Sequence, residues 1–484
     1  MATTNGKIYP NLIGGEWRTS DDSTLENRNP ADYNEIIGLF PMATLEDTRI
    51  AIKQAGLALP AWARTPAPVR GAILDKASQI ISERLDEIAR TLTREEGKTL
   101  AEAKGEVMRA RDIFKYYAGE GWRQGGEVLP NSVNDELLYT RREPLGVVSI
   151  ITPWNFPIAI PAWKIAPALI YGNTVVFKPA EDAPLTALMM VEALVEAGLP
   201  PGVINFLTGD GDLIGTEMTS NPHVNGISFT GSHNTGTRVY QNAIKHMARV
   251  QLEMGGKNAL VVLKDADITL AVKLAITGGF GLTGQACTAT SRVIAEEEIA
   301  DEFISALISA TKNLVVGNGL ENGVQMGPLV NQDQLQTSQS YMTLGQEEGA
   351  RLLLGGEVDD GKGYFAQATI FDHVQPTMRI AQEEIFGPVI SVMRASGIDD
   401  AIEKANAIHF GLSASVVTNN LKLAFAFANQ VNAGVVKINA PTTGVALNAP
   451  FGGFKHSSAN TFKEQGQAAV EFYTRTKTIY VNHG

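Results

Sequence analysis

Three short β-branched runs decide the fold: Val147-Val148-Ser149-Ile150-Ile151, Thr174-Val175-Val176-Phe177 and Val203-Ile204-Asn205-Phe206. Helical stretches such as Leu185 to Ala197 alternate with them. Strands that alternate with helices at this spacing are typical of a doubly wound parallel sheet with helices on both faces. We therefore expect an α/β lobe in this part of the chain.

The same alternation restarts after Glu253. Residues 258–263 read as a strand and 267–280 as a helix, and further strands are expected near 292–295, 389–393, 413–418 and 434–438. Upstream, apolar residues recur at helical spacing through residues 45–120. The sequence thus predicts two α/β lobes with a boundary near 253–258.

Two segments favour a β element outside both lobes. Residues 122–145 resemble an extended hairpin that projects from the first lobe, and residues 474–481 alternate polar and apolar side chains like an edge strand.

Composition limits the class of protein. The chain has 484 residues, 44% of them hydrophobic, and a net charge of −12. These values indicate a globular protein of two or more domains and argue against nucleic acid or an anionic membrane as the main partner. The segment 1–7 lacks the apolar core of a signal peptide, so we expect a cytoplasmic protein. The seven histidines show no metal-ligand spacing, and we expect no metal site.

The single cysteine lies in Gly284-Gln285-Ala286-Cys287-Thr288, with Glu253 34 residues upstream in Leu252-Glu253-Met254-Gly255-Gly256. A lone cysteine is often a small buried hydrophobe. Small and polar neighbours leave this sulfur approachable, however, and a thiol needs a nearby base to react at neutral pH. We interpret Cys287 as a nucleophile and Glu253 as its base.

Two motifs suit a dinucleotide. Phe229-Thr230-Gly231-Ser232-His233-Asn234-Thr235-Gly236 follows a strand and leads into a helix, whose amino terminus suits a phosphate, although its spacing is not G-x-G-x-x-G. Lys178 and Glu181 end a strand and suit a ribose, with a solvated loop as the alternative. Gly209-Asp210-Gly211 comes closer to the usual glycine pattern but reads as a turn.

Two rigid turns carry further candidates. Thr152-Pro153-Trp154-Asn155-Phe156-Pro157 holds Asn155 between two prolines, which suits an oxyanion hole as well as a structural turn. Glu383-Glu384-Ile385-Phe386-Gly387-Pro388 sets a carboxylate beside an aromatic ring, and either a second ribose site or a surface turn explains it.

Taken in this order, the motifs resemble those of the aldehyde dehydrogenase superfamily, from about residue 10 to the carboxyl terminus. The resemblance implies that Cys287 is the nucleophile, Glu253 the general base, and Asn155, with the Cys287 N–H, the oxyanion hole. It implies a catalytic role for Lys178 as well, and it assigns the cofactor to Lys178, Glu181, Trp154, Gly231, Ser232, Gly255, Glu384 and Phe386.

The resemblance also implies an architecture and a reaction. Residues 1–121 and 146–254 would form a variant Rossmann cofactor domain, 255–460 a catalytic domain, and 122–145 with 461–484 a small β oligomerisation element. The enzyme would oxidise an aldehyde to a carboxylic acid, with NAD or NADP as the cofactor. The assembly would be a homodimer or homotetramer.

The substrate follows from finer likeness. Residues 153–168, 450–458 and 464–466 are similar to those of α-ketoglutaric semialdehyde (2,5-dioxopentanoate) dehydrogenases, with succinate semialdehyde or a broad range of aldehydes as alternatives. Such a substrate carries a carboxylate, so Arg109 is the expected anchor. The other possibility is that Arg109 faces solvent or pairs with Glu106 or Asp112. Phe156, Trp163 and Phe451 would form apolar walls.

Three other readings stay open: a silent protein that keeps the fold, a coenzyme-A-acylating relative, and a non-phosphorylating glyceraldehyde-3-phosphate dehydrogenase. The presence of Cys287 and Glu253 argues against the first, and Glu253 favours hydrolysis over the second. The third needs a more basic substrate mouth than the sequence offers.

Overall fold

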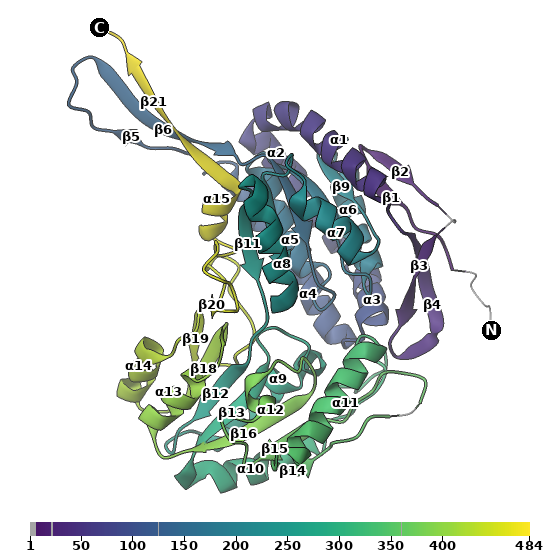
Figure 1. Ribbon diagram of the computed structural model, residues 1–484, viewed down its shortest axis with the longest axis vertical. Helices are drawn as coiled ribbons and strands as arrows, with labels where there is room; N and C mark the ends of the chain where they lie inside the picture. The colour runs from purple at the N-terminus through teal and green to yellow at the C-terminus, as the bar shows by residue number, and fades with distance from the viewer. Residues whose placement is uncertain (1–5, 21–22, 124, 360) are drawn as a thin grey trace.

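The computed structural model describes residues 6–20, 23–123, 125–359 and 361–484, and it has two α/β lobes with a thin β arm (Figure 1). Each lobe is built on one seven-stranded sheet, so the expected pair of lobes is confirmed. Residues 1–5, part of the segment expected to lack a signal peptide, lie outside the described residues. None of the described helices is long and apolar enough to cross a membrane.

The first sheet contains all three runs that decided the fold. Its strands follow the order β11-β10-β7-β8-β9-β1-β2, and the first five are parallel. The β-branched side chains are buried on both faces, as in the central strands of a parallel sheet. Two strands that the sequence did not predict, β1 and β2, add antiparallel at one edge. The strands are β1 (Asn11–Ile13), β2 (Glu16–Arg18), β7 (Val147–Ile151), β8 (Thr174–Lys178), β9 (Ile204–Phe206), β10 (Gly226–Thr230) and β11 (Arg249–Glu253).

The helical region expected at 45–120 is four helices. Thr44 and Thr99 each begin one with a capping box, and Gly97, at φ 98°, ends another in a conformation that side chains disfavour. The turn from Gly97 to Thr99 is therefore tight and sets Lys98 between two helix ends. The helices of this lobe are α1 (Leu45–Arg64), α2 (Ala67–Glu83), α3 (Leu85–Glu96), α4 (Leu100–Glu120), α5 (Ala159–Ile170), α6 (Pro184–Glu196), α7 (Gly211–Ser220) and α8 (His233–Ala243), followed by the short η1 (Ile244–His246).

The second sheet follows the order β14-β15-β16-β13-β12-β18-β19, with only β14 antiparallel among its described strands. It confirms the strands expected after residue 258. Its strands are β12 (Asn258–Val262), β13 (Thr290–Glu296), β14 (Arg351–Leu354), β15 (Thr369–Asp372), β16 (Val389–Ala395), β18 (Ser413–Val417) and β19 (Val435–Ile438). The helices around it are α9 (Ile268–Gly279), α10 (Glu297–Thr311), α11 (Gln332–Glu347), α12 (Arg379–Gln382), α13 (Ile398–Asn406) and α14 (Leu421–Gln430), with the short η2 (Gly281–Gly284).

The chain passes from one sheet to the other where the sequence predicts a boundary. The last strand of the first sheet ends at Glu253, and the first strand of the second begins at Asn258. The candidate base thus lies at the carboxyl end of a strand, between the two sheets. Two small hairpin-like pairs complete the lobes: β3 (Thr24–Asn29) with β4 (Asp32–Pro41), and β17 (Phe410–Gly411) with β20 (Phe454–Lys455).

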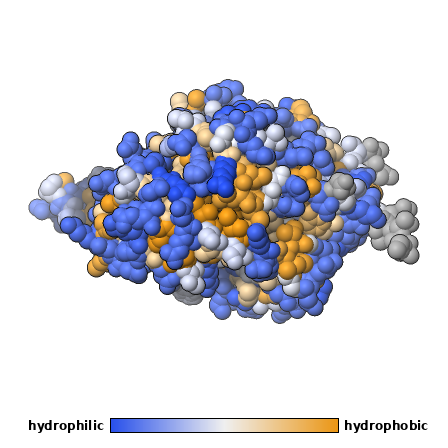
Figure 2. Space-filling model, turned by 90° about the horizontal axis from the view of Figure 1, so that it is seen from below, coloured by the Kyte–Doolittle hydropathy of each residue, from blue (hydrophilic) through white to orange (hydrophobic). Residues whose placement is uncertain are grey.

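The arm is a three-stranded antiparallel sheet that projects from the first lobe (Figure 1). The predicted hairpin forms β5 (Val128–Leu129) and β6 (Glu136–Pro144), and β21 (Thr474–Asn482) pairs with β6 along its whole length. The expected element began at 461, but α15 (Ala468–Tyr473) packs into the first lobe's core. Seen from below, the second lobe's surface is largely hydrophilic, with hydrophobic residues gathered near its middle (Figure 2).

Candidate active site

Cys287 lies in a tightly folded loop between α9 and β13. Leu282 and Thr283 adopt left-handed conformations, with φ of 53° and 56°, and Gly284 follows at φ 73°. A side chain at Gly284 would overlap with the carbonyl oxygen of Gly387. The close contact between these two backbone segments therefore requires glycine at position 284. The loop leaves Cys287 partly exposed to a cavity of about 350 Å³.

Asn155 is held next to this loop from the other lobe. It follows β7 and precedes α5, and its side chain is buried. Its Nδ2 donates to the backbone oxygen of Gln285 at 2.8 Å, two residues before Cys287. Since an amide nitrogen has two hydrogens, the second is available for an oxyanion formed at the cysteine. The turn that the sequence left open therefore brings Asn155 to the cysteine loop.

Glu253 is a buried carboxyl group at the end of β11. Ser458 donates to its Oε1 at 3.4 Å, and its Oε2 has no hydrogen-bond partner among the described residues. Burial raises the pKa of Glu253 well above its ordinary value, and the neighbouring carboxylate of Glu464 adds to the shift. A carboxyl group with a raised pKa and a free oxygen is suited to taking a proton from water.

The thiol of Cys287 is shifted in the same direction. Burial raises its pKa, the carboxylates of Glu384 and Glu253 raise it further, and a hydrogen bond from the Thr288 N–H acts in the opposite sense. The thiol is therefore neutral at rest, and it needs a base to become a nucleophile.

All four residues expected to contact the substrate line the cavity at Cys287. Phe156, Trp163 and Phe451 form apolar walls, with the last two rings 6.1 Å apart. Arg109 lies among them, half-buried, and its Nη2 donates to the amide oxygen of Gln465 at 2.9 Å. Burial lowers the pKa of Arg109.

The alternative partners for Arg109 are wrong. Glu106 instead forms an ion pair with Lys98 at 2.6 Å, and Asp112 pairs with Arg111 at 2.9 Å. Among the ion pairs of the described residues, none includes Arg109. The guanidinium therefore has no ion-pair partner among the described residues, although the nearby charge of Asp112 acts to raise its pKa, and it borders a cavity whose lining is mostly apolar but includes Glu102 and Glu106.

One cofactor candidate of the first lobe lies in a groove of about 600 Å³. Glu181 lines it together with Gly211, Thr235 and Arg238. Lys178, buried at the end of β8, reaches Glu181 at 3.4 Å, and burial lowers its pKa. The alternative that Lys178 lies in a solvent-exposed loop is therefore wrong.

The predicted phosphate site is a helix amino terminus. Ser232 caps α8 and accepts from the Thr235 N–H at 3.2 Å, and the Gly231 N–H donates to the backbone oxygen of Glu253 at 3.1 Å. The first turn of a helix leaves N–H groups free to bind an anion. Helix α8 contributes Thr235 and Arg238 to the groove that Glu181 lines.

The second ribose candidate lies between the lobes. Glu384 Oε1 accepts from the Gly256 N–H at 2.8 Å, and a side chain at Gly255 would overlap with this carboxyl group. Burial raises the pKa of Glu384 to about 7. Trp154 and Phe386 pack edge to face with ring centroids 5.4 Å apart, so the Asn155 turn and the Glu384 turn are in contact.

Several residues of these sites gave no clear signal in the sequence. Gly211, part of the motif read as a turn, donates its N–H to Glu181 at 2.9 Å and lines the groove. Residues 443–445 line the cavity from a loop with no motif. Lys98 and Glu102 contact the Asn155 turn and the cysteine loop, and a capping-box pattern was their only trace. Among the described residues, no cluster of histidine, cysteine and acidic side chains could hold a metal ion.

Comparisons with known proteins agree with this geometry. The model of the aldehyde dehydrogenase family matches residues 17–479. The chain is 47% identical to the alpha-ketoglutaric semialdehyde dehydrogenase of Bacillus subtilis, over 99% of both chains. It is 44% identical to the 2,5-dioxopentanoate dehydrogenase of Saccharolobus solfataricus, over 98% of this chain and 99% of the relative.

The fold is likewise similar to solved structures. A betaine aldehyde dehydrogenase from Staphylococcus aureus, crystallised in complex with NAD+, superimposes with a TM-score of 0.95 at 35% identity, covering 98% of this chain and 95% of the other. The family model, the relatives and the fold agree over nearly the whole length. This chain belongs to the aldehyde dehydrogenase family.

Proposed function

We propose that this protein oxidises an acid semialdehyde, with α-ketoglutaric semialdehyde as the preferred substrate, to the corresponding dicarboxylic acid. The observation that carries the proposal is Arg109, a half-buried cation in the apolar cavity that contains Cys287. A half-buried guanidinium whose described hydrogen bond goes to a neutral amide keeps N–H groups that a substrate carboxylate can bind. The names of the two relatives quoted above point to the same substrate.

The chemistry begins at sulfur. Glu253 accepts the thiol proton of Cys287 and releases it to bulk water. The thiolate then attacks the aldehyde carbon, a C–S bond forms as the C=O π bond breaks, and the carbonyl oxygen becomes an oxyanion that Asn155 Nδ2 and the Cys287 N–H stabilise. Bound NAD would take up the hydride that leaves this carbon, which converts the adduct into a thioester. The oxyanion hole acts again when water attacks the thioester.

Glu253 acts again in the second half of the reaction. Ionised, it accepts a proton from water, and the oxygen of that water attacks the thioester carbon. The C–S bond then breaks, the carboxylic acid leaves and the thiol is restored. A water-activating carboxylate favours hydrolysis over transfer to coenzyme A.

The cofactor assignment uses the groove of the first lobe. Glu181 and Lys178 would hold the adenosine ribose, Ser232 and Gly231 the diphosphate, and Glu384 the nicotinamide ribose. Gly255, Trp154 and Phe386 would shape the nicotinamide end. A carboxylate at Glu181 accepts from a ribose 2′-OH and repels a 2′-phosphate, so we propose a preference for NAD over NADP.

Substrate choice is assigned to the cavity wall. A guanidinium binds a carboxylate through two parallel hydrogen bonds, whereas Phe156, Trp163 and Phe451 favour the methylene chain. Gln465 keeps Arg109 oriented, because its amide oxygen accepts at 2.9 Å without neutralising the charge.

We also assign the enzyme to the cytoplasm.

The substrate proposal is tested by exchanging Arg109 for methionine. Arg109→Met should raise the KM for α-ketoglutaric semialdehyde by about tenfold to a hundredfold, because it removes a charge-assisted hydrogen-bonded pair. The KM for pentanal should change less than about threefold, because pentanal has no carboxylate that Arg109 could bind. Steady-state kinetics of NADH formation without coenzyme A would measure both.

Two results would contradict the proposal. Equal losses for the charged and the uncharged aldehyde would remove Arg109 from substrate recognition. A wild-type enzyme with a higher kcat/KM for pentanal than for the semialdehyde would indicate a broad-range aldehyde dehydrogenase instead.

A further inference from the structure

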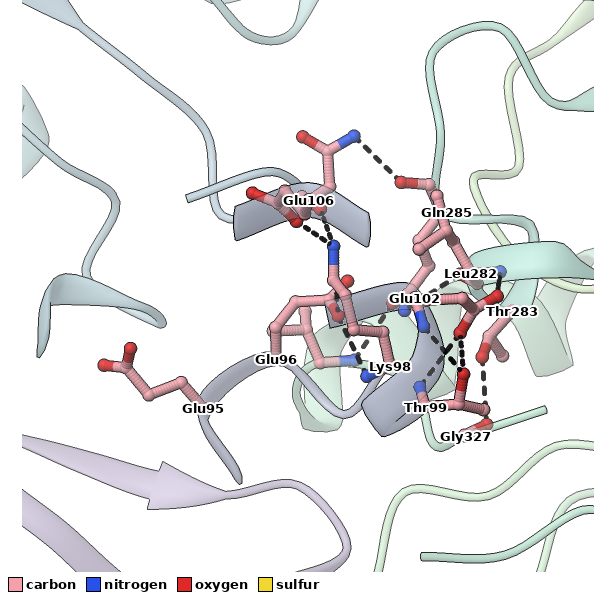
Figure 3. A network of polar contacts seen from close by, with 12 residues as sticks. Glu95, Glu96, Lys98, Thr99, Glu102, Glu106, Leu282, Thr283, Gln285 and Gly327 are labelled. Carbon is pink, nitrogen blue, oxygen red and sulfur yellow. Dashed lines mark hydrogen bonds and ion pairs between the residues drawn. The ribbon is translucent and has the colours of Figure 1, made fainter. Parts of the chain in front are cut away.

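Lys98 is an ammonium group enclosed by protein in the turn between α3 and α4. Its side chain has no exposed surface, and Glu106 beside it is 2% exposed. The Lys98 Nζ lies 2.6 Å from Glu106 and 3.7 Å from Glu96 (Figure 3). It does not line the substrate cavity.

This lysine is held in its charged form. Burial by itself lowers the pKa of Lys98, but the attraction of Glu106 and Glu96 outweighs it and raises the pKa above the ordinary value. A buried ion pair contributes little net stability, because desolvation offsets the attraction. The arrangement therefore calls for an explanation other than stability.

The Lys98 ammonium contacts the turn that carries the oxyanion donor. Its Nζ donates to the backbone oxygen of Asn155 at 2.7 Å and lies 4.5 Å from the centre of the Phe156 ring. Glu106 completes the clamp, since one of its oxygens accepts from the N–H groups of Ile158 and Ala159, each at 3.1 Å. These two residues start α5, so residues 155–159 are held by one ion pair.

The same helix also holds the loop of the nucleophile. Glu102, one turn before Glu106 on α4, accepts from the Leu282 N–H at 2.8 Å (Figure 3). Leu282 and Thr283 both have positive φ, a conformation that persists in such residues only when surrounding contacts impose it. The Thr283 hydroxyl donates to the backbone oxygen of Gly327 at 3.0 Å, which is a second such contact.

These contacts close a ring. Lys98, at the start of α4, donates to the Asn155 backbone oxygen, and the Asn155 side-chain amide donates to the Gln285 backbone oxygen. Leu282, in the same loop as Gln285, donates its N–H to Glu102 on α4. The distance between an oxyanion donor and its nucleophile must be correct to a fraction of an ångström for full effect. One rigid helix end sets both sides of that distance here.

We propose that Lys98 is a positioning residue: its buried ammonium, through the Asn155 backbone oxygen, fixes the Asn155 amide relative to Cys287. The proposal rests on the proposed function, because it requires Asn155 to stabilise the oxyanion. Lys98 touches neither the aldehyde nor the cofactor.

A double-mutant cycle tests whether Lys98 acts through Asn155. All proteins carry Glu106→Gln, which avoids a buried carboxylate without its cation when Lys98→Met is added. The Glu106→Gln parent lacks the Lys98–Glu106 ion pair but retains the Lys98 ammonium, with Glu96 3.7 Å away, so each Lys98→Met variant is compared with this parent and not with the wild type. The measured quantity is the single-turnover rate of NADH formation from propanal, which does not depend on Arg109.

With Asn155 present, Lys98→Met should lower this rate about 10-fold to 100-fold, the scale expected for a misplaced oxyanion donor. In the Asn155→Ala background the same change should lower it less than about threefold, because coupled residues are not additive. The KM for propanal and the rate of Cys287 alkylation by iodoacetamide should stay within about threefold in every variant, since neither depends on the oxyanion.

Equal losses in both backgrounds, or no loss with Asn155 present, would overturn the positioning role and leave the proposed function intact. An Asn155→Ala enzyme that reacts at the wild-type rate would overturn the oxyanion role in the proposed function as well. Glu95→Gln controls for general loss of stability. This buried carboxylate on α3 accepts from Leu185 and Thr186, away from the cavity, and its exchange should lower the melting temperature without changing the rate.

Discussion

The same surroundings raise the pKa of Glu253 and the pKa of Cys287. Glu464 lies near enough to raise the pKa of each, although its own charge is paired with Lys164. The ionised forms that carry out the proposed chemistry therefore accumulate only as the pH rises. Desolvation makes the Glu253 carboxylate and the Cys287 thiolate stronger bases. It also lowers the fraction of each group that is ionised at a given pH.

The pH dependence of turnover follows from this arrangement. Because the pKa of Glu253 is raised, kcat should increase with pH, by up to about tenfold per pH unit below that pKa if one deprotonation limits the rate. Glu464→Gln removes a negative charge and frees the Lys164 cation, and both changes lower the pKa of Glu253. The rising limb should therefore move to lower pH in stopped-flow or steady-state kinetics.

The wild-type enzyme is the control for that shift. A rate that is constant from pH 5.5 upward, or a limb that moves to higher pH in Glu464→Gln, would show that another group limits turnover.

At the scale of elements, the cysteine loop depends on one backbone position. In Gly284→Ala, the alanine would have to adopt a left-handed backbone conformation, and its Cβ would overlap with the Gly387 backbone oxygen. The loop must therefore move. We expect a loss of at least about tenfold in kcat, because the nucleophile is displaced. Gly349→Ala is the matched control, since Gly349 has φ 90° and open space around it.

Activity assays and thermal melts on both variants would check this prediction. Both proteins should lose stability from the strained φ, Gly284→Ala more than Gly349→Ala because of the overlap with Gly387, and only Gly284→Ala should lose activity. Full activity in Gly284→Ala would mean that the loop tolerates displacement.

The elements that the sequence predicted share a strong periodic pattern. Strands β7, β8 and β12 are continuous apolar runs, and burial on both faces confirms them. Strand β3 was missed because its residues, Thr24–Asn29, are mostly polar, and its stability comes from distant partners. Asn27, for example, donates to the backbone oxygen of Asp182 at 2.8 Å. Such a contact depends on the whole fold and leaves no local pattern.

The site shows the same division. Cys287, Glu253, Asn155 and Ser232 stand in recognisable motifs, so the sequence alone predicts each of them as a site residue. Lys98 could not be found this way, because a lysine before a capping box usually lies in solvent. Only the packing of α4 against α5 and the cysteine loop makes it a buried cation.

At the scale of the whole molecule, the arm and the second sheet each offer an unpaired edge. Strand β21 is largely exposed, with Tyr480 63% exposed, and Val128 on β5 is 77% exposed. Strand β19 forms an edge of the second sheet. Exposed edges with apolar side chains tend to pair with another chain. We therefore propose a homodimer, or a tetramer built from two dimers.

Light scattering coupled to gel filtration would test the assembly. At micromolar concentration the mass should be two or four times the 51.9 kDa of one chain. Tyr480→Lys, which adds a charge to the arm, should shift the mass toward the monomer. A monomeric wild-type protein would contradict this proposal.

The central claim is that the aldehyde is oxidised while bound to Cys287 and released by Glu253. The most direct measurement is the intact mass of Glu253→Gln after incubation with NAD and α-ketoglutaric semialdehyde, followed by an acid quench and peptide mapping. We expect one NADH per active site and a thioester adduct on the Cys287 peptide, because acylation proceeds and hydrolysis stalls. Cys287→Ser should form neither. Repeated turnover by Glu253→Gln at the wild-type rate, or an adduct on another residue, would contradict the account.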